Sequence, residues 1–316
     1  MRLIAVLVSV GFAAPVAAQS YSVVDLPQEY YWEDMNDRGD VTGPTTNGFE
    51  TWSARMVDGV VERLDLPGRT NQAKAINNLG FVVGTHSSNS FGGAFLYDTE
   101  PVIFDLQHAS DINEHGAVSG VSYRNGIVSG GIWKDGVMTT VDPQTLDQLF
   151  FRAINNHGAV VGVEITFEFG RRDGVYWTEA TGLVNLGANT SVRDINDLGY
   201  ACGDGMIWLN GVLHSTFVGA AGWINNSNHM LGYTGAGATV WRGNGAELIQ
   251  PLIQDSRYVV DELLDFNERG QILAGVYFNG STDAQTVILT PVPEPGTWLA
   301  MGIGTTWLVR SRRRQR

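Results

Sequence analysis

Apolar and polar residues follow one short phrase that returns seven times along the chain. An apolar residue precedes Asn, two variable residues, Gly and a second apolar run that ends in Gly. The copies are residues 35–43, 76–84, 112–120, 154–162, 195–203, 224–232 and 266–275, the last with one extra residue. The copies lie about 38 residues apart, and a fixed period of this size indicates an array, a solenoid or a propeller.

Each phrase predicts a strand, a tight turn and a second strand. Asn favours the turn because its side chain bonds to its own backbone, and Gly permits a positive φ. Asn228 stands where the other copies have Gly, and Asn is the next most tolerant residue for that conformation. The predicted structural turn residues are Asn36, Gly39, Asn77, Gly80, Asn113, Gly116, Asn155, Gly158, Asn196, Gly199, Asn225, Asn228, Asn267 and Gly270.

A second hairpin follows within most repeats. Its clearest turns are Asp58-Gly59, Asp135-Gly136, Asn210-Gly211 and Asn244-Gly245. These pairs favour type I′ turns, in which both central residues have positive φ. Two hairpins make four strands, which is one blade of a propeller. We therefore expect an all-β fold, a seven-bladed β-propeller of four-stranded blades over residues 19–290.

The two ends of this body predict how the ring closes. The last repeat has a third strand over residues 285–289 but meets Pro291 before a fourth. Residues 21–26 form a strand that has no blade of its own. Its ending, Val-Asp-Leu-Pro, matches the Leu-Asp-Leu-Pro of residues 64–67 at a predicted fourth strand. We expect the N-terminal strand to complete the last blade, because closure removes exposed strand edges.

The chain termini differ from the body. Residues 1–18 have the basic Arg2, an apolar run and small residues at 16–18, which predicts a signal peptide. A buried N-terminal helix is the alternative, but no amphipathic period supports it. At the other end, residues 296–309 are uncharged and mostly apolar, and arginines follow. This segment predicts a short hydrophobic helix, barely long enough for a bilayer, with its arginines on the cytoplasmic side.

Residues 291–316 resemble the PEP-CTERM sorting signal of Gram-negative bacteria. The matching residues are Pro293, Glu294 and Pro295 of the Val-Pro-Glu-Pro box, and Arg310, Arg312, Arg313 and Arg314 of the basic cluster. The resemblance implies that an exosortase, a membrane cysteine peptidase, processes this chain. It also implies export, transient anchoring in the inner membrane, and a final place at the cell surface or outside the cell. A plain tail anchor is the alternative.

The repeats resemble the HAF family of extracellular repeats, named for a His-Ala-Phe element. Ala94 and Phe95 fit that element, whereas Gly93 replaces its His. The resemblance covers the whole body through the Asn-x-x-Gly phrases. It implies an extracellular repeat protein and carries no chemistry to particular residues.

Net charge limits the classes of binding partner, and the cysteine count limits the possible disulfides. The whole chain has a formal net charge of −13, and six arginines lie in the terminal segments. The body therefore carries about −19 and should repel nucleic acid and anionic lipid. The single cysteine, Cys202, excludes an internal disulfide.

Candidate chemistry is sparse. Asp111-x-Asn113 and Asp194-x-Asn196 resemble the start of a calcium loop, but the next ligand position and the later acidic ligand are missing. The histidines lack zinc spacing, and Cys202 takes a small apolar position of the repeat. We expect no metal, no cofactor and no catalytic residue. Trp32 and Trp223 lie just before a phrase and are candidate aromatics of a ligand-binding face.

These observations favour a non-catalytic exported protein that associates with exopolysaccharide or other envelope components. The alternative is a secreted propeller enzyme, a glycosidase or lyase acting on polysaccharide. That alternative needs two carboxylates that converge at the ring centre. The sequence leaves open whether the protein is an enzyme.

Overall fold

The computed structural model describes residues 19–87, 92–144, 147–166, 170–243 and 245–292. The predicted signal peptide, the predicted C-terminal helix and the sorting residues from Pro293 onward lie outside this part of the chain. Within it, no helix is long and apolar enough to cross a membrane. The helical element found there is one 3-10 turn, η1 (Gln250–Leu252).

The described strands form three four-stranded sheets and two eight-stranded sheets. Each eight-stranded sheet divides into two groups of four antiparallel strands, and the resulting groups are numbered 1 to 7 in chain order. Groups 1 to 4 contain β2 (Asp34–Met35), β3 (Val41–Thr46), β4 (Thr51–Val57) and β5 (Val60–Arg63); β6 (Thr70–Ile76), β7 (Val82–Ser87), β8 (Gly92–Tyr97) and β9 (Pro101–Phe104); β10 (His108–Ile112), β11 (Val118–Arg124), β12 (Ile127–Lys134) and β13 (Val137–Val141); and β14 (Gln148–Ile154), β15 (Val160–Ile165), β16 (Arg172–Thr178) and β17 (Gly182–Ala188).

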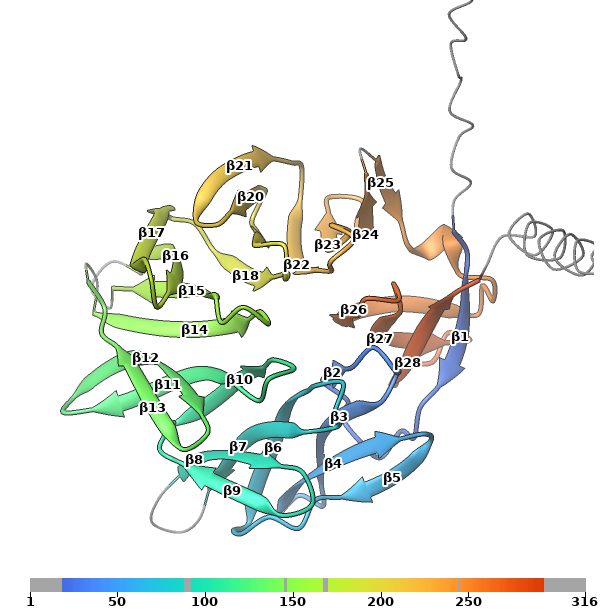
Figure 1. The fold of residues 1–316 in the computed structure, drawn as a ribbon. Coiled ribbons are helices and arrows are strands. Elements are labelled where there is room, and N and C mark those ends of the chain that lie inside the picture. Colours follow the sequence, from blue (N-terminus) through green and yellow to red (C-terminus); the bar gives the residue numbers. More distant parts are fainter. Residues whose placement is uncertain (1–18, 88–91, 145–146, 167–169, 244, 293–316) are drawn as a thin grey trace, which may run out of the picture.

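Groups 5 to 7 contain β18 (Val192–Ile195), β19 (Tyr200–Gly203), β20 (Met206–Leu209) and β21 (Val212–Thr216); β22 (Ala220–Ile224), β23 (Met230–Thr234), β24 (Gly237–Arg242) and β25 (Gly245–Leu248); and β26 (Tyr258–Phe266), β27 (Ile272–Phe278), β28 (Ala284–Pro291) and β1 (Tyr21–Asp25). Single parallel bridges link group 1 to group 2 and group 3 to group 4. The groups stand around a central opening (Figure 1), so the prediction of an all-β propeller is confirmed.

Group 7 is assembled from both ends of the described chain. β1 pairs antiparallel with β28, from Tyr21 opposite Pro291 to Asp25 opposite Val287. Tyr21 is fully buried and its hydroxyl accepts a hydrogen bond from Arg242 of group 6. The pairing confirms the predicted partner of the N-terminal strand.

The hydrophobic core is divided into layers between neighbouring groups. Val83 and Leu96 of group 2, for example, pack in one cluster with Ala109 and Val118 of group 3. The layer between groups 7 and 1 contains Leu273 and Ile288 together with Trp32, Met35 and Val41. The apolar residues of each strand thus face the next group, and burial of these faces holds the ring together.

Aromatic side chains of the third strands lie in these layers. Trp133 stacks on Phe104 of the preceding group, with ring centroids 4.5 Å apart. Trp241 meets Phe217 edge-on at 5.1 Å. Both contacts join neighbouring groups, so these rings are part of the packing that holds the ring together.

The second hairpins turn where the sequence indicates in three cases. Asp58, Asp135 and Asn210 have φ near +50°, and the Gly after each is also positive. In the fourth predicted turn, Asn244-Gly245, Asn244 lies outside the described residues. Gly245 is not a turn residue, because it pairs with Arg242 as the first residue of β25. Gly243, on the other side of Asn244 in the sequence, has φ +56°.

Candidate functional site

The repeated phrases meet at the ring centre, because the first strand of every group ends at the residue before the phrase's Asn. Each of these seven Asn side chains is almost fully buried. In group 4, the Asn155 Oδ1 accepts the backbone N–H groups of His157 at 3.1 Å and Ala159 at 2.9 Å. The fifth residue of each phrase has positive φ, from +58° at Asn228 to +88° at Gly39.

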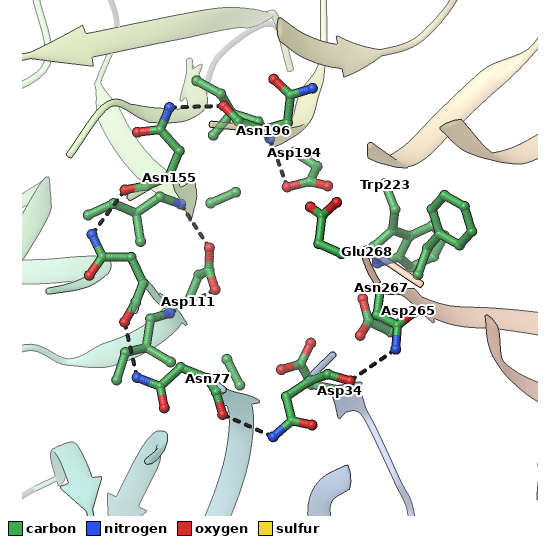
Figure 2. A pocket seen from close by; sticks show the side chains of 18 of the residues that line it. Asp34, Asn77, Asp111, Asn155, Asp194, Asn196, Trp223, Asp265, Asn267 and Glu268 are labelled. Atoms are coloured by element: carbon green, nitrogen blue, oxygen red, sulfur yellow. Dashed lines mark hydrogen bonds between the residues drawn. The ribbon is translucent and has the colours of Figure 1, made fainter. Parts of the chain in front are cut away.

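The same asparagines form a closed circle of hydrogen bonds. Each Nδ2 donates to the backbone carbonyl oxygen of the Asn in the next group, at 2.9–3.3 Å. The order is Asn36, Asn77, Asn113, Asn155, Asn196, Asn225 and Asn267, and Asn267 donates to Asn36 at 3.0 Å (Figure 2). One side chain therefore serves two purposes: its oxygen fixes a turn and its nitrogen binds the neighbouring group.

A second circle lies one residue further along. The backbone N–H of each residue after the Asn donates to the side chain of its counterpart in the next group, at 2.7–3.1 Å. The members are Asp37, Asn78, Glu114, Asn156, Asp197, Asn226 and Glu268. Acids occupy groups 1, 3, 5 and 7, and amides occupy groups 2, 4 and 6, so groups 7 and 1 place two acids side by side.

The third layer consists of aspartates two residues before the Asn. Asp34, Asp111, Asp194 and Asp265 each accept the backbone N–H of the residue that precedes the next group's Asn, at 2.7–2.9 Å. They too belong to groups 1, 3, 5 and 7, whereas groups 2 and 4 have Ala and group 6 has Trp223. Figure 2 shows these carboxylates around the opening.

Burial dominates the electrostatics of these acids. It raises the pKa of Asp194 to about 6 and that of Asp111 well above its usual range. Burial, and then the charge of Asp265, raise the pKa of Asp34, and burial raises the pKa of Asp265. Burial and the neighbouring negative charge thus both favour the protonated form of Asp34.

The layers enclose a polar cavity of about 390 Å³. In groups 2 to 6 the wall also contains the residue three before the Asn, and in groups 2 to 7 this residue lies at a β-bulge. A bulge turns an extra side chain out of the regular alternation. The bulge residues are Lys74, Ser110, Arg152, Arg193, Gly222 and Leu264. The lining of the cavity thus combines acids of the phrases with the basic bulge residues Lys74, Arg152 and Arg193.

The residues that resemble the start of a calcium loop bind backbone N–H groups in the structure. Both carboxylate oxygens of Asp194 accept backbone N–H groups, from Ile195 and Ile224, and the Oδ1 of Asn196 accepts two more. Among the described residues no group of three or more His, Cys, Asp or Glu side chains is arranged to hold a metal. Cys202 is buried in the core between groups 5 and 6, where burial raises the pKa of its thiol.

The two candidate ligand-face tryptophans differ in their surroundings. Trp32 is only 1% exposed, its indole N–H donates to the Pro27 carbonyl oxygen, and its ring stacks on Tyr30. The layer between groups 7 and 1 covers most of this ring, but Trp32 also lines a second cavity together with Trp223, so its place on a ligand-binding face stays a prediction. Trp223 is half-buried and lies at the wall of the central cavity (Figure 2).

The last glycine of the phrase has a role that the sequence reasoning missed. A Cβ at Gly43, Gly84, Gly120, Gly162, Gly203 or Gly232 would lie well inside contact distance of the carbonyl oxygen five residues before the phrase's Asn. Recurrence of the glycine was the available signal. In group 7 the pairing of Leu263 with Ala274 gives this position to Ala274, not Gly275. The seventh phrase therefore has Ala in place of Gly rather than one extra residue.

No family model matches the chain, and no curated protein sequence matches it. Among solved structures, TolB from Acinetobacter baumannii is 15% identical with a TM-score of 0.37, over 48% of this chain and 41% of TolB. YCF48 from Cyanidioschyzon merolae is 13% identical with a TM-score of 0.37, over 87% and 99%. The Pyrococcus horikoshii acylaminoacyl peptidase is 13% identical with a TM-score of 0.44, over 85% of this chain and 51% of the peptidase. Likeness at this level carries no argument about activity.

Proposed function

We propose that this chain is an exported, non-catalytic surface or secreted protein that associates with exopolysaccharide or other envelope components. In this proposal each four-stranded group is one blade, so that the body is a complete seven-bladed propeller. An exosortase cleaves the C-terminal sorting segment after the chain has reached the inner membrane.

The observation that carries the non-catalytic assignment is the engagement of the repeated polar residues. The phrase asparagines form one circle of hydrogen bonds, and the residues that follow them form another. The four aspartates of the third layer accept backbone N–H groups from neighbouring blades. Groups held in this way support the ring, because each buried backbone donor needs a partner.

The paired carboxyls Asp34 and Asp265 favour the enzyme alternative most, since a glycosidase needs one protonated and one ionised acid. Each of the two carboxyls, however, already accepts a backbone N–H group of the next group, from Ile76 and Met35, and so helps to hold the ring together. We therefore prefer the binding role. A hydrolysis screen of bacterial polysaccharides tests this choice. New reducing ends in the products would favour the enzyme alternative over the binding role.

Cell fractionation tests the export part of the proposal. The full chain is expressed in a Gram-negative host that has an exosortase, next to Glu294→Ala. We expect the wild type outside the cytoplasm, shortened at both ends by mass spectrometry, and the variant retained in the inner membrane with its C-terminal segment. Equal processing of both chains would contradict the sorting assignment.

Association with polysaccharide is tested separately, by co-sedimentation of the exported protein with the host's purified exopolysaccharide. A protein that stays in the supernatant at all polysaccharide concentrations would contradict this part of the proposal.

A further inference from the structure

A second cavity, of about 840 Å³, lies where the ring departs from its regular pattern. Its wall comes from the segment before β2, from Arg193 of group 5 and from groups 6 and 7. Arg193, Gly222 and Trp223 line the central cavity as well. The volume of the second cavity falls in the range of small-molecule sites, roughly 300–1,000 Å³.

The cavity exists because group 6 lacks the bulge side chain that its neighbours have. Groups 4 and 5 have Arg152 and Arg193 at this position, and group 6 has Gly222. A Cβ at Gly222 would meet no atom within 4 Å, so the missing side chain leaves open space rather than a close contact. The next residue is Trp223, where the other groups have Asp or Ala. Group 6 thus has a glycine and a tryptophan where group 4 has Arg-Ala and group 5 has Arg-Asp, so this part of the wall is open and uncharged.

Aromatic rings border this space on two sides. Tyr31, from the segment before β2, is 65% exposed, and Tyr233 of β23 is 39% exposed. The Tyr233 hydroxyl accepts the backbone N–H of Leu263 at 2.7 Å, which holds its ring in place. Exposed aromatic faces with polar edges suit a ligand that is apolar on one face and polar at its rim. A pyranose ring has C–H groups on its faces and hydroxyls around its edge.

The charge of the wall selects among sugars. Three acids, Glu33, Asp261 and Glu262, line the cavity together with one cation, Arg193. Glu33 forms an ion pair with Lys74, and Asp261 accepts a hydrogen bond from Tyr277. Glu262 is exposed and has no ion pair among those seen in the described residues. A wall with excess negative charge repels uronates and favours a cationic group.

We propose that this cavity binds an amino-sugar residue of a polysaccharide, with its ring against Tyr31 and Trp223 and its ammonium group on Glu262. The inference rests on the proposed association with exopolysaccharide and gives that association a site and a sugar class. An ammonium on a carboxylate forms a charge-assisted hydrogen bond, which is stronger than a neutral one.

Isothermal titration of the full chain, purified in mild detergent, tests the site with three oligosaccharides of equal length. These are a glucosamine oligomer, its N-acetylated counterpart, which has no charge, and a galacturonate oligomer. We expect the glucosamine oligomer to bind about tenfold more tightly than the N-acetylated one, and the galacturonate oligomer not to bind. No binding of glucosamine, or equal binding of the two glucosamine forms, would overturn the assignment.

Two substitutions locate the binding site. Gly222→Leu puts a side chain into the cavity beside Trp223, where the sugar ring is placed, and should abolish binding without a change in thermal stability, because the added atoms enter open space. Gly235→Leu is its matched control, since Gly235 also has free space around it but lies in the β23–β24 turn. Glu262→Gln should weaken glucosamine binding about tenfold and leave the N-acetylated oligomer unaffected. Binding that survives Gly222→Leu would overturn the site.

These outcomes separate the site from the proposed function. If the wild type and Gly222→Leu co-sediment equally with the host's exopolysaccharide, the association stands and the cavity is not its site. If neither co-sediments although the glucosamine oligomer still binds the wild type alone, the cavity stands and the association fails.

Discussion

Substitution of one asparagine tests whether the circle of hydrogen bonds between the phrase asparagines stabilises the ring. Asn155→Ala removes the two bonds that Oδ1 accepts from His157 and Ala159, and the Nδ2 bond to the Asn196 carbonyl oxygen at 2.9 Å. Asn155 is 5% exposed and the Ala159 residue is 4% exposed, so water does not readily replace these partners.

The size of the effect follows from those bonds. Three hydrogen bonds at about 1 kcal/mol each give a loss near 3 kcal/mol in the free energy of unfolding. The buried Ala159 N–H then lacks its partner, which puts the loss toward the upper side of that value. For a domain of this size, the melting temperature should fall by about 6–12 °C.

Urea unfolding followed by tryptophan fluorescence measures the change, with Asn47→Ala as the matched control. The Oδ1 of Asn47 also accepts two backbone N–H groups, from Phe49 and Glu50 at 2.9 Å, but in an exposed turn. Water replaces these bonds, and we expect a loss of at most about 1 kcal/mol. Asn155→Asp keeps the acceptor and removes the donor, and so isolates the bond between groups. Equal losses for Asn155→Ala and Asn47→Ala would refute the reasoning.

Three further predictions concern the backbone, the closure and the acids. Gly162→Ala should cost about 3 kcal/mol or more, because its Cβ would meet the Phe150 carbonyl oxygen, whereas Gly222→Ala should be neutral; equal urea midpoints would contradict this. Deletion of residues 21–25 should expose the amides of β28 to hydrogen exchange before those of other strands; unchanged protection there would exclude closure by β1. The folded pKa of Asp194 is about 6, above its unfolded value, so its stabilisation is full below about pH 4 and is lost as the pH rises through 6. Asp194→Asn should flatten urea stability between these pH values, and an unchanged profile would show that Asp194 is not the titrating group.

The local pattern of the chain determines much of this architecture. Period-two strands, Asn-Gly and Asp-Gly turns and the recurrence of the phrase depend on residues within a few positions of one another, and such interactions can be recognised in a sequence. The unpaired strand predicted at residues 21–26 was assigned to the last group by counting strands, and the pairing of residues 21–25 with β28 follows that count. Failures were also local: Gly245 begins β25 instead of standing in a turn, and Ala274 took the place of a repeated glycine.

Only the tertiary structure decided what the repeated residues do across the ring. The phrase predicts that Asn77 closes a turn, but its Nδ2 bond to the Asn113 carbonyl oxygen spans 36 residues and exists only because neighbouring groups stand side by side. Burial of Trp32 and the space beside Gly222 depend likewise on residues that are distant in sequence. The sequence alone determines which residues can turn, extend or repeat. Which of them are covered, bonded or left facing a cavity is set by packing between groups, because that packing brings together positions that no local pattern relates.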